Sequence, residues 1–191
     1  TEAVRRKPYS IILFDEIEKA HPEVFNVLLQ ILDDGRLTDN QGRTVDFKNT
    51  IIIMTSNLGG RYLIEGTKDA KNEVLKLVKS SFKPEFVNRI DEIIVFNSLN
   101  KDTQMKIVDK MLEDLLSRLE SQKYHFRFSE LVKAKILNDA YDPDYGARPL
   151  KRYIQHHIES IIAKKIIEGM VTPDNTYYLN VIGDEFIVQN N

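Results

Sequence analysis

The 191-residue sequence contains no cysteine, which excludes disulfide bonds, cysteine nucleophiles and thiolate metal sites. Long hydrophobic runs are also missing. The longest apolar runs, among them Ile11–Phe14 and Ile51–Met54, are four residues long, whereas a membrane-spanning helix needs about 20 apolar residues. No signal or transit peptide begins at Thr1. We therefore expect a soluble protein with no membrane partner, in the cytosol or in the interior of a mitochondrion or plastid; the sequence leaves these compartments open.

Charge of one sign is not in excess either. The 27 Lys and Arg residues nearly balance the 29 Asp and Glu residues, for a net charge of −2, so nucleic acid is not an expected partner. The four histidines show no zinc pattern, because His156 and His157 are adjacent and do not share a helix face. Glycine is scarce, and the eight glycines include no G-x-x-x-x-G-K-[ST] phosphate-binding loop.

The first half of the chain mixes short apolar runs with helical periodicity, which is typical of an α/β fold. Residues 9–14 and 50–55 predict strands covered on both faces, and residues 92–96 predict a third strand. A helix is expected over residues 22–34, because Pro22 suits a first helical position and Gly35 suits the position after the last turn. The other expected elements here are a hairpin within residues 36–49, with its tip at 39–42, and a helix at 69–82.

The second half has a different sequence pattern, in which apolar residues recur every three or four positions. We place a domain boundary near residues 97–100 and expect a small, mostly helical α+β domain after it. Its expected elements are a long amphipathic helix around 105–119, a strand at 123–128, a helix at 130–141 with Ser129 as N-cap, a helix at 147–168 ended by Gly169, and a hairpin at 177–189 that turns at Gly183-Asp184.

Two carboxylates, Asp15 and Glu16, follow the first apolar run where it is expected to leave the sheet. Ligands of open α/β sheets bind at the carboxyl ends of strands, and neighbouring residues of a strand point in different directions. One carboxylate can therefore hold Mg²⁺ through its water shell while the other polarises an attacking water. The alternative is a solvated acidic pair at a strand end.

Asn57 follows the second apolar run in the same way. If the two strands are parallel neighbours, its amide lies on the same edge as Glu16 and can orient a water by hydrogen bonding. Alternatively, Asn57 only forms a turn before Gly59-Gly60.

Two arginines extend this set. Arg89 can reach the nucleotide of a neighbouring subunit and stabilise charge on its γ-phosphate, or it can form an internal salt bridge to Asp91 or Glu92. Arg148 begins a predicted helix, where the guanidinium and the helix dipole would attract phosphate together. Its alternative role is a contact at the start of that helix, to Asp142 or Asp144.

The motifs are far more specific together than singly. In chain order they read IILFDEIEKAHPEVFNVLLQILDDGRLTDNQGRTVDFKNT, IIIMTSNLGG, FKPEFVNRIDEIIVF and YDPDYGARPLKR. This combination resembles the second ATPase module of Clp-type AAA+ unfoldases, and the resemblance covers essentially the whole chain. The family fold implies the C-terminal part of a parallel-sheet ATPase subdomain over residues 1–97 and a small lid subdomain over residues 98–191, with nucleotide between them.

The resemblance also implies residue roles. Asp15 and Glu16 occupy the Walker B positions, where Asp15 would support Mg²⁺ through water and Glu16 would activate the hydrolytic water. Asn57 looks like sensor 1, Arg89 like the arginine finger that acts across a subunit interface, and Arg148 like sensor 2. The implied cofactors are ATP and Mg²⁺. The family works as a homo-hexameric ring that threads unfolded or aggregated polypeptides through a central pore, so the implied partners are further subunits, such polypeptides and a co-chaperone system.

The sequence departs from the family pattern in two places. The Walker A loop and the aromatic pore loop are missing, and both precede Thr1 in the family, so the sequence looks like a fragment that does not hydrolyse ATP unaided. The segment from Asn57 to Arg89 also lacks the tripeptide with which some Clp unfoldases dock a protease, and its NLGG-x-x-L-I-E-G stretch looks more like ClpB-type disaggregases. The alternatives are a protease-coupled Clp unfoldase and, for the fragment alone, a non-catalytic oligomerisation module.

Overall fold

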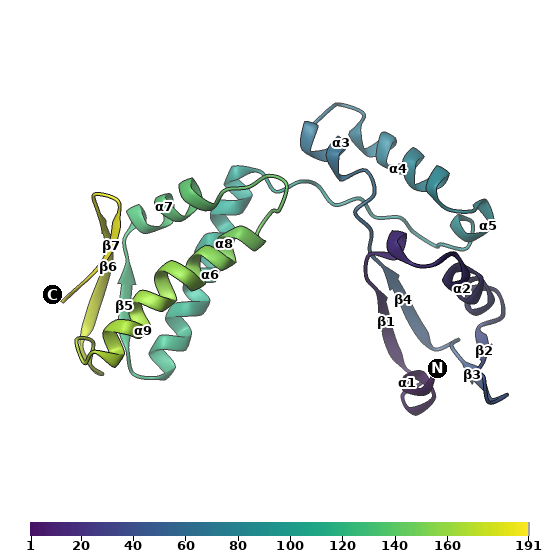
Figure 1. Ribbon diagram of the computed structural model, residues 1–191, viewed down its shortest axis with the longest axis horizontal. Coiled ribbons are helices and arrows are strands. Elements are labelled where there is room, and N and C mark those ends of the chain that lie inside the picture. Colours follow the sequence, from purple (N-terminus) through teal and green to yellow (C-terminus); the bar gives the residue numbers. More distant parts are fainter. Residues whose placement is uncertain (191) are drawn as a thin grey trace. The chain divides into compact units, whose positions relative to one another are not determined.

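The computed structural model describes residues 1–190 and divides the chain into two compact units, Thr1–Asn97 and Ser98–Asn191 (Figure 1). Unit 1 combines helices with a pair of parallel strands, and unit 2 is mostly helical with a small sheet. This mixed α/β architecture is the predicted fold class. Among the described residues, no helix has both the length and the apolar character that a membrane-spanning segment requires.

Unit 1 is built around the parallel pair β1–β4, and a separate antiparallel hairpin, β2–β3, lies beside it. Helix α2 starts and ends at the predicted residues, with Pro22 in its first turn and Gly35 as a left-handed C-cap (φ 65°). The short helices α1, α3 and α5 are not anticipated by the sequence analysis. The elements of unit 1 are α1 (Glu2–Arg6), β1 (Ser10–Phe14), the 3₁₀ turn η1 (Ile17–Lys19), α2 (Pro22–Asp34), β2 (Arg36–Thr38), β3 (Thr44–Asp46), β4 (Thr50–Met54), α3 (Gly60–Glu65), α4 (Ala70–Ser81) and α5 (Pro84–Val87).

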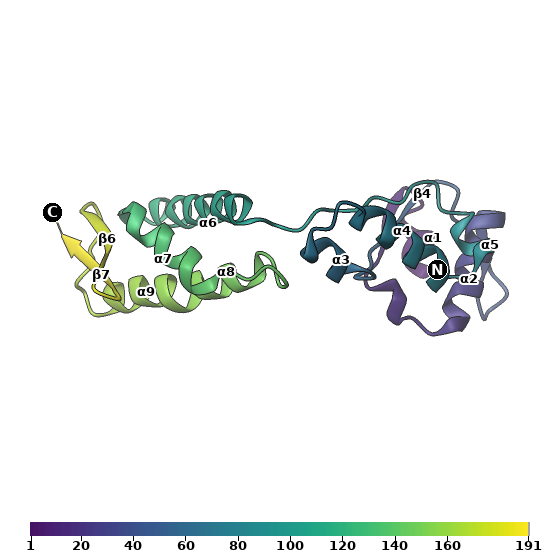
Figure 2. The same cartoon turned by 90° about the horizontal axis from the view of Figure 1, so that it is seen from above.

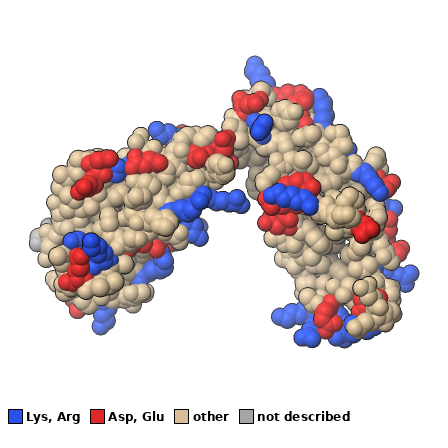
Figure 3. All heavy atoms as spheres, in the orientation of Figure 1, with Lys and Arg blue, Asp and Glu red and all other residues tan. Residues whose placement is uncertain are grey.

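Only one face of the β1–β4 pair is covered. Ile12 and Ile52 pack with α1, α2 and the hairpin, while Phe14 and Met54 join a cluster around Leu28. The prediction that both faces are buried is wrong for this chain, because alternate side chains of both strands face outward. In Figure 3, the surface over β1 accordingly carries few charged side chains. The outward-facing residues are Ile11 (67% exposed), Leu13 (59%), Ile51 (62%) and Ile53 (43%).

The predicted third strand at residues 92–96 does not form. The sheet that contains β1 has two strands, and residues 92–96 belong to no strand. Ile94 and Phe96 are 66% and 81% exposed. An apolar run becomes a strand only where a neighbouring strand satisfies its backbone groups, and no strand of unit 1 does so here.

Unit 2 has one continuous core, to which all its helices and its three-stranded sheet contribute. Figure 2 shows α6 running alongside the rod formed by α8, η2 and α9, and Arg118 of α6 pairs with Glu159 of the rod at 2.5 Å. The elements of unit 2 are α6 (Lys101–Ser121), β5 (His125–Phe128), α7 (Glu130–Ala140), α8 (Arg148–Tyr153), the π-helical turn η2 (Ile154–Glu159), α9 (Ser160–Ile167), β6 (Thr176–Ile182) and β7 (Glu185–Asn190).

Two details of unit 2 differ from the sequence expectation. The helix predicted over residues 147–168 is interrupted by the π-helical turn η2, which the apolar periodicity does not reveal. Ser129 does occupy the N-cap position of α7, but its hydroxyl makes no cap hydrogen bond. It bonds the Asn180 side chain of β6 instead, at 2.9 Å, and so ties the start of the helix to the sheet.

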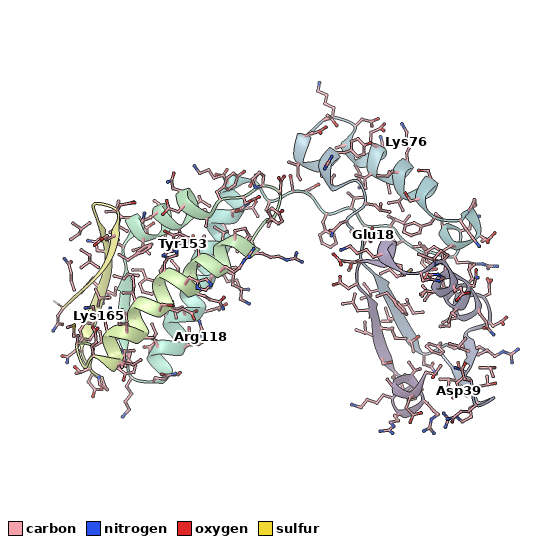
Figure 4. All side chains as sticks on the ribbon, in the orientation of Figure 1. Glu18, Asp39, Lys76, Arg118, Tyr153 and Lys165 are labelled. Carbon is pink, nitrogen blue, oxygen red and sulfur yellow. The ribbon has the colours of Figure 1, made fainter. Side chains whose placement is uncertain are left out.

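A polar cluster fastens α7 to α8 and to the β6–β7 turn. Asp139 accepts hydrogen bonds from the Tyr153 hydroxyl (2.6 Å) and from Lys135 (2.8 Å), and Lys135 also contacts Asp184 in the turn. The bond from Lys135, followed by that from Tyr153, lowers the pKa of Asp139 to about 2. Burial and the bond to Asp139 raise the pKa of Tyr153, which Figure 4 labels, to about 12.

A buried glutamine organises the loop before α8. Gln104 of α6 is 0% exposed. Its amide donates to the carbonyl of Leu99 (3.2 Å) and to the carbonyl of Asp142 (3.0 Å). The α7–α8 loop is therefore anchored to the start of α6, and this loop leads directly into Arg148.

Candidate functional site

The carboxyl ends of β1 and β4 lie side by side, because the two parallel strands are in register along their whole length. The pairing continues past the strands: the Thr55 amide donates to the Phe14 carbonyl (2.9 Å), and the Ile17 amide donates to the Thr55 carbonyl (3.0 Å). The polar residues that follow each strand therefore meet at one edge of the sheet. We call the group formed by Asp15, Glu16, Thr55 and Asn57 the acidic edge.

Thr55 connects the two carboxylate-bearing residues. Its hydroxyl donates to Asp15 Oδ1 at 2.5 Å and accepts from the Glu16 backbone amide at 3.1 Å. Thr55 is not among the site residues expected from the sequence. The signal that would have found it is its position directly after β4, beside the residue that follows β1 in a parallel register.

Glu16 has a left-handed backbone conformation, with φ 53° and ψ 52°. This conformation is uncommon for a residue with a side chain, and such residues cluster at functional sites, where the surrounding structure holds them. Here the bond from the Glu16 amide to Thr55 holds the turn. The turn separates the directions of the two neighbouring carboxylates, which suits two different roles.

The Glu16 carboxylate has two described partners. Lys19 Nζ donates to Oε2 at 2.8 Å, and Asn57 Nδ2 donates to Oε1 at 3.5 Å, a long contact. The bond to Glu16 is also the main cause that raises the pKa of Lys19. The structure thus brings Asn57 to Glu16, as predicted from adjacent parallel strands. It adds Lys19, which the sequence analysis missed although it lies one helical turn beyond Glu16.

Glu18 is a second missed residue. It is partly buried in η1, and its Oε1 accepts from the Asn57 backbone amide at 3.2 Å. Figure 4 labels it at the edge of the sheet where the chain leaves β1 and β4. The alternation of acidic and apolar residues in Glu16-Ile17-Glu18 is the available signal, since Ile17 is buried (5% exposed) beneath the turn.

Arg89 lies just after α5 and forms an internal salt bridge, with Nε 2.5 Å from Asp33 Oδ1 of α2. The partners expected for such a salt bridge, Asp91 and Glu92, are wrong, because Asp33 is distant in sequence and is brought to Arg89 by the packing of α5 against α2. Both members of the pair are about half exposed, at 55% and 40%. Within residues 1–190, no ion pair or hydrogen bond links Arg89 to the acidic edge.

Arg148 is the first residue of α8 and lies in unit 2, so its approach to the acidic edge of unit 1 stays a prediction. Its side chain is exposed, and the described ion pairs include none from Arg148 to Asp142 or Asp144. Asp142 instead accepts the backbone amides of Asp144 (2.8 Å) and Tyr145 (3.0 Å). Gly146, with φ 61°, then turns the chain into the helix.

The part of the chain that the structure describes holds no group of three or more His, Cys, Asp or Glu side chains that could enclose a metal ion. Magnesium does not require such a cage, because it keeps several waters and is commonly bound through one or two carboxylates and the substrate phosphates. Asp15 is exposed and offers a hard oxygen donor. The residues present therefore fit Mg²⁺ held through water and phosphate.

An apolar groove of about 590 Å³ also lies in unit 1, along β1 between α1 and α2. Residues such as Ile12, Val27 and Phe47 line it, and the side chains of the acidic edge do not. Its lining is mostly apolar, with Thr1, Lys7 and Ser10 as its polar residues, and it contains no Asp or Glu that could hold a metal ion. The groove is therefore not the candidate site. The candidate site is the acidic edge, which is open and not a cavity.

Sequence comparison assigns each unit to a described family. Residues 1–93 match the family described as AAA domain (Cdc48 subfamily), and residues 99–179 match the C-terminal, D2-small domain of ClpB protein. The Chaperone protein ClpB of Lactiplantibacillus plantarum is 53% identical over 197 residues, and that of Mycoplasma genitalium is 52% identical over 192 residues; each alignment covers 100% of this chain. They cover 23% and 26% of those two relatives, so the chain spans about a quarter of their length.

Structure comparison gives the same result. A chain of the Saccharomyces cerevisiae Hsp104:casein complex in its extended conformation matches with a TM-score of 0.86 and 38% identity. The match covers 100% of this chain and 34% of that chain. The predicted resemblance is confirmed by both comparisons: this chain belongs to the ClpB/Hsp104 family of AAA+ proteins, and it corresponds to a C-terminal segment of them.

Proposed function

We propose that the chain is part of an ATP-driven, hexameric protein disaggregase and that the acidic edge is its hydrolytic site. The observation that carries this proposal is the juxtaposition of Asp15, Glu16 and Asn57 at the carboxyl ends of two parallel strands. Ligands of open α/β sheets bind at such edges. The relatives are named chaperone protein ClpB, and the Hsp104 structure contains casein.

Each residue of the acidic edge has a distinct role in this proposal. Asp15 holds Mg²⁺ through water, and its orientation is fixed by the Thr55 hydroxyl. When bound, the ion neutralises charge on the phosphates of ATP. Glu16 accepts the proton of the attacking water, and Asn57, whose amide lies 3.5 Å from Glu16 Oε1, orients that water. Lys19, which contacts Glu16 Oε2 at 2.8 Å, would hold the orientation of the Glu16 carboxylate until the water is in position.

The two arginines act on phosphate charge from outside the acidic edge. Arg148 would contact the nucleotide bound at this edge, and Arg89 would contact the nucleotide of a neighbouring subunit. The exposed ion pair of Arg89 with Asp33 is compatible with this role, because pairs of this kind contribute only about 0–1 kcal/mol and can be exchanged for a phosphate contact. Residues 1–97 and 98–191 would be the partial large subdomain and the lid of the ATPase.

The intact protein would thread aggregated or unfolded polypeptides through a homo-hexameric ring, together with a co-chaperone system. A protease-coupled Clp unfoldase is the rival within the family. The absence of a docking tripeptide between Asn57 and Arg89 argues against it. A pull-down with a peptidase ring separates the two functions, since stable capture of the ring would favour the rival.

The proposal is tested in a hybrid protein: the full-length L. plantarum ClpB in which residues 1–191 replace the matching segment. We expect the hybrid to hydrolyse ATP and to solubilise a heat-aggregated reporter enzyme, and we expect Glu16→Gln to remove part of the hydrolysis while leaving ATP binding intact. We call that part the Glu16-dependent turnover. The 191-residue chain alone should show no turnover, because it has no phosphate-binding loop. Equal hydrolysis by the hybrid and its Glu16→Gln variant would refute the proposal.

A further inference from the structure

Glu18 makes contacts that the proposed mechanism does not yet use. It lies in η1, directly after the left-handed turn at Glu16. Its Oε1 accepts the backbone amide of Asn57 at 3.2 Å, across 39 residues of sequence. Its other oxygen, Oε2, is buried and has no hydrogen-bond partner among the described residues.

The pKa of the Glu18 carboxyl nevertheless lies below its usual value. Burial raises the pKa of Glu18, but its own backbone amide, the Asn57 amide and the nearby Ser56 side chain lower that pKa by more. An ionised acceptor binds an N–H group about twice as strongly as a neutral one. The Asn57 amide is therefore held by a charge-assisted bond in the loop between β4 and α3.

This bond fixes the backbone from which the Asn57 side chain projects. Asn57 itself is exposed, and its amide nitrogen lies at the long distance of 3.5 Å from Glu16 Oε1. The rest of the loop is held from its far side: the Gly60 amide donates to the Asn57 carbonyl at 3.3 Å, and an added Cβ on Gly59 would meet Val74 Cγ2 at 2.9 Å. Glu18 supplies the described hydrogen bond that ties the Asn57 amide to the β1 side of the edge.

We propose that Glu18 is a positioning residue, which holds Asn57 opposite Glu16 so that both can contact the same water. The inference rests on the proposed function of the acidic edge. The length of the Glu18 side chain is what matters in this role, because its carboxylate oxygen must extend to the Asn57 amide. A residue that instead contributed its negative charge to the site would act on the metal and the phosphates, and the two roles respond differently to substitution.

Two substitutions distinguish the effect of the length of the Glu18 side chain from the effect of its charge. Glu18→Gln keeps an oxygen acceptor at the same distance and removes the charge, whereas Glu18→Asp keeps the charge and shortens the side chain by one methylene. In the hybrid protein, we expect Glu18→Asp to lower the Glu16-dependent kcat by about 10- to 100-fold, since a misplacement of about 1 Å can cost up to about 100-fold. Its KM for ATP should change by less than about twofold, because uniform binding is untouched. Glu18→Gln should remain within about threefold of the parent, because the neutral acceptor binds the Asn57 amide more weakly but holds it at the same distance.

The same substitutions in an Asn57→Ala background complete the test. If Glu18 acts through Asn57, Glu18→Asp lowers kcat no further in that background. Glu73→Gln serves as the matched control, because Glu73 is a carboxylate of unit 1 that pairs with Lys76 on α4; its kcat should equal that of the parent. Circular dichroism and hexamer formation, measured for every variant, separate misfolding from misplacement.

Each alternative outcome is decisive. An unchanged kcat in Glu18→Asp, or a loss that multiplies with that of Asn57→Ala, overturns the positioning role while the proposed function stands. A loss in Glu18→Gln with activity kept in Glu18→Asp also overturns it, in favour of a charge effect. If Asn57→Ala leaves the Glu16-dependent turnover unchanged, that result contradicts both the proposed role of Asn57 and this inference.

Discussion

Thr55→Val tests whether the acidic edge is held together as described. The substitution keeps the shape of the side chain and removes two hydrogen bonds, one to Asp15 Oδ1 (2.5 Å) and one from the Glu16 amide (3.1 Å). A typical hydrogen bond contributes about 1 kcal/mol net. The bond to Asp15 is charge-assisted but exposed to solvent, so we assign it no more than that. The local loss is therefore about 1–2 kcal/mol, part of it offset by release of the left-handed strain at Glu16.

Amide hydrogen exchange in the 191-residue chain measures this loss at the Glu16 amide. A loss of about 1.4 kcal/mol corresponds to about tenfold faster exchange. The Ile17 amide donates to the Thr55 carbonyl, which the substitution retains, so its exchange should change less. Thr67→Val is the control, because Thr67 is exposed between α3 and α4. Unchanged exchange at Glu16 in Thr55→Val, or an equal acceleration in Thr67→Val, would refute the reasoning.

Three further predictions concern the packing around the site and the core of unit 2. In urea unfolding, Gly59→Ala should destabilise unit 1 by about 1–2 kcal/mol, because φ is +75° and the new Cβ would meet Val74. The control is Gly60→Ala, whose new Cβ meets nothing within 4 Å, and it should be neutral or stabilising in the same experiment. Gln104→Met should cost about 1–3 kcal/mol, because two partly buried carbonyls lose their donor. An unchanged unfolding midpoint would contradict the anchoring role. The pKa of Asp139 is lowered from 3.8 to about 2 in the folded chain, so its contribution is complete above pH 4 and is lost as the pH falls towards 2. Asp139→Asn should therefore be less stable than the parent at neutral pH. In urea unfolding, the difference in free energy of unfolding between the two should become small at pH 2. A difference that stays constant with pH would contradict the stabilising role of the Asp139 cluster.

Local patterns predicted the parts of the fold that local forces determine. The Pro22 and Gly35 signals located both ends of α2, because capping is a property of the adjacent residues. The four-residue apolar runs located β1 and β4, and the polar residues after them identified the acidic edge. The expectation that Asn57 lies beside Glu16 needed only that the two strands be parallel neighbours, and they are.

The sequence predictions that the structure contradicts concern features that depend on residues distant in sequence. Residues 92–96 have the composition of a strand, but no neighbouring strand pairs with them in unit 1. Ile11 and Ile51 were expected to be buried because apolar runs are typical of covered strands, yet nothing described covers their face. Arg89 pairs with Asp33, and Glu18 contacts Asn57. Such contacts depend on how the elements pack, which composition and spacing do not specify.

The most direct test of the account is a structure of the hybrid hexamer with Mg²⁺ and a non-hydrolysable ATP analogue. We predict that Asn57 and Glu16 of one subunit contact the same water beside the γ-phosphate, and that Arg148 of that subunit lies within hydrogen-bonding distance, about 3 Å, of that phosphate. Asp15 should lie beside the Mg²⁺ waters, and Arg89 should approach from the neighbouring subunit. Arg148 directed away from a nucleotide bound at the acidic edge, or a nucleotide bound elsewhere in the chain, would contradict the account.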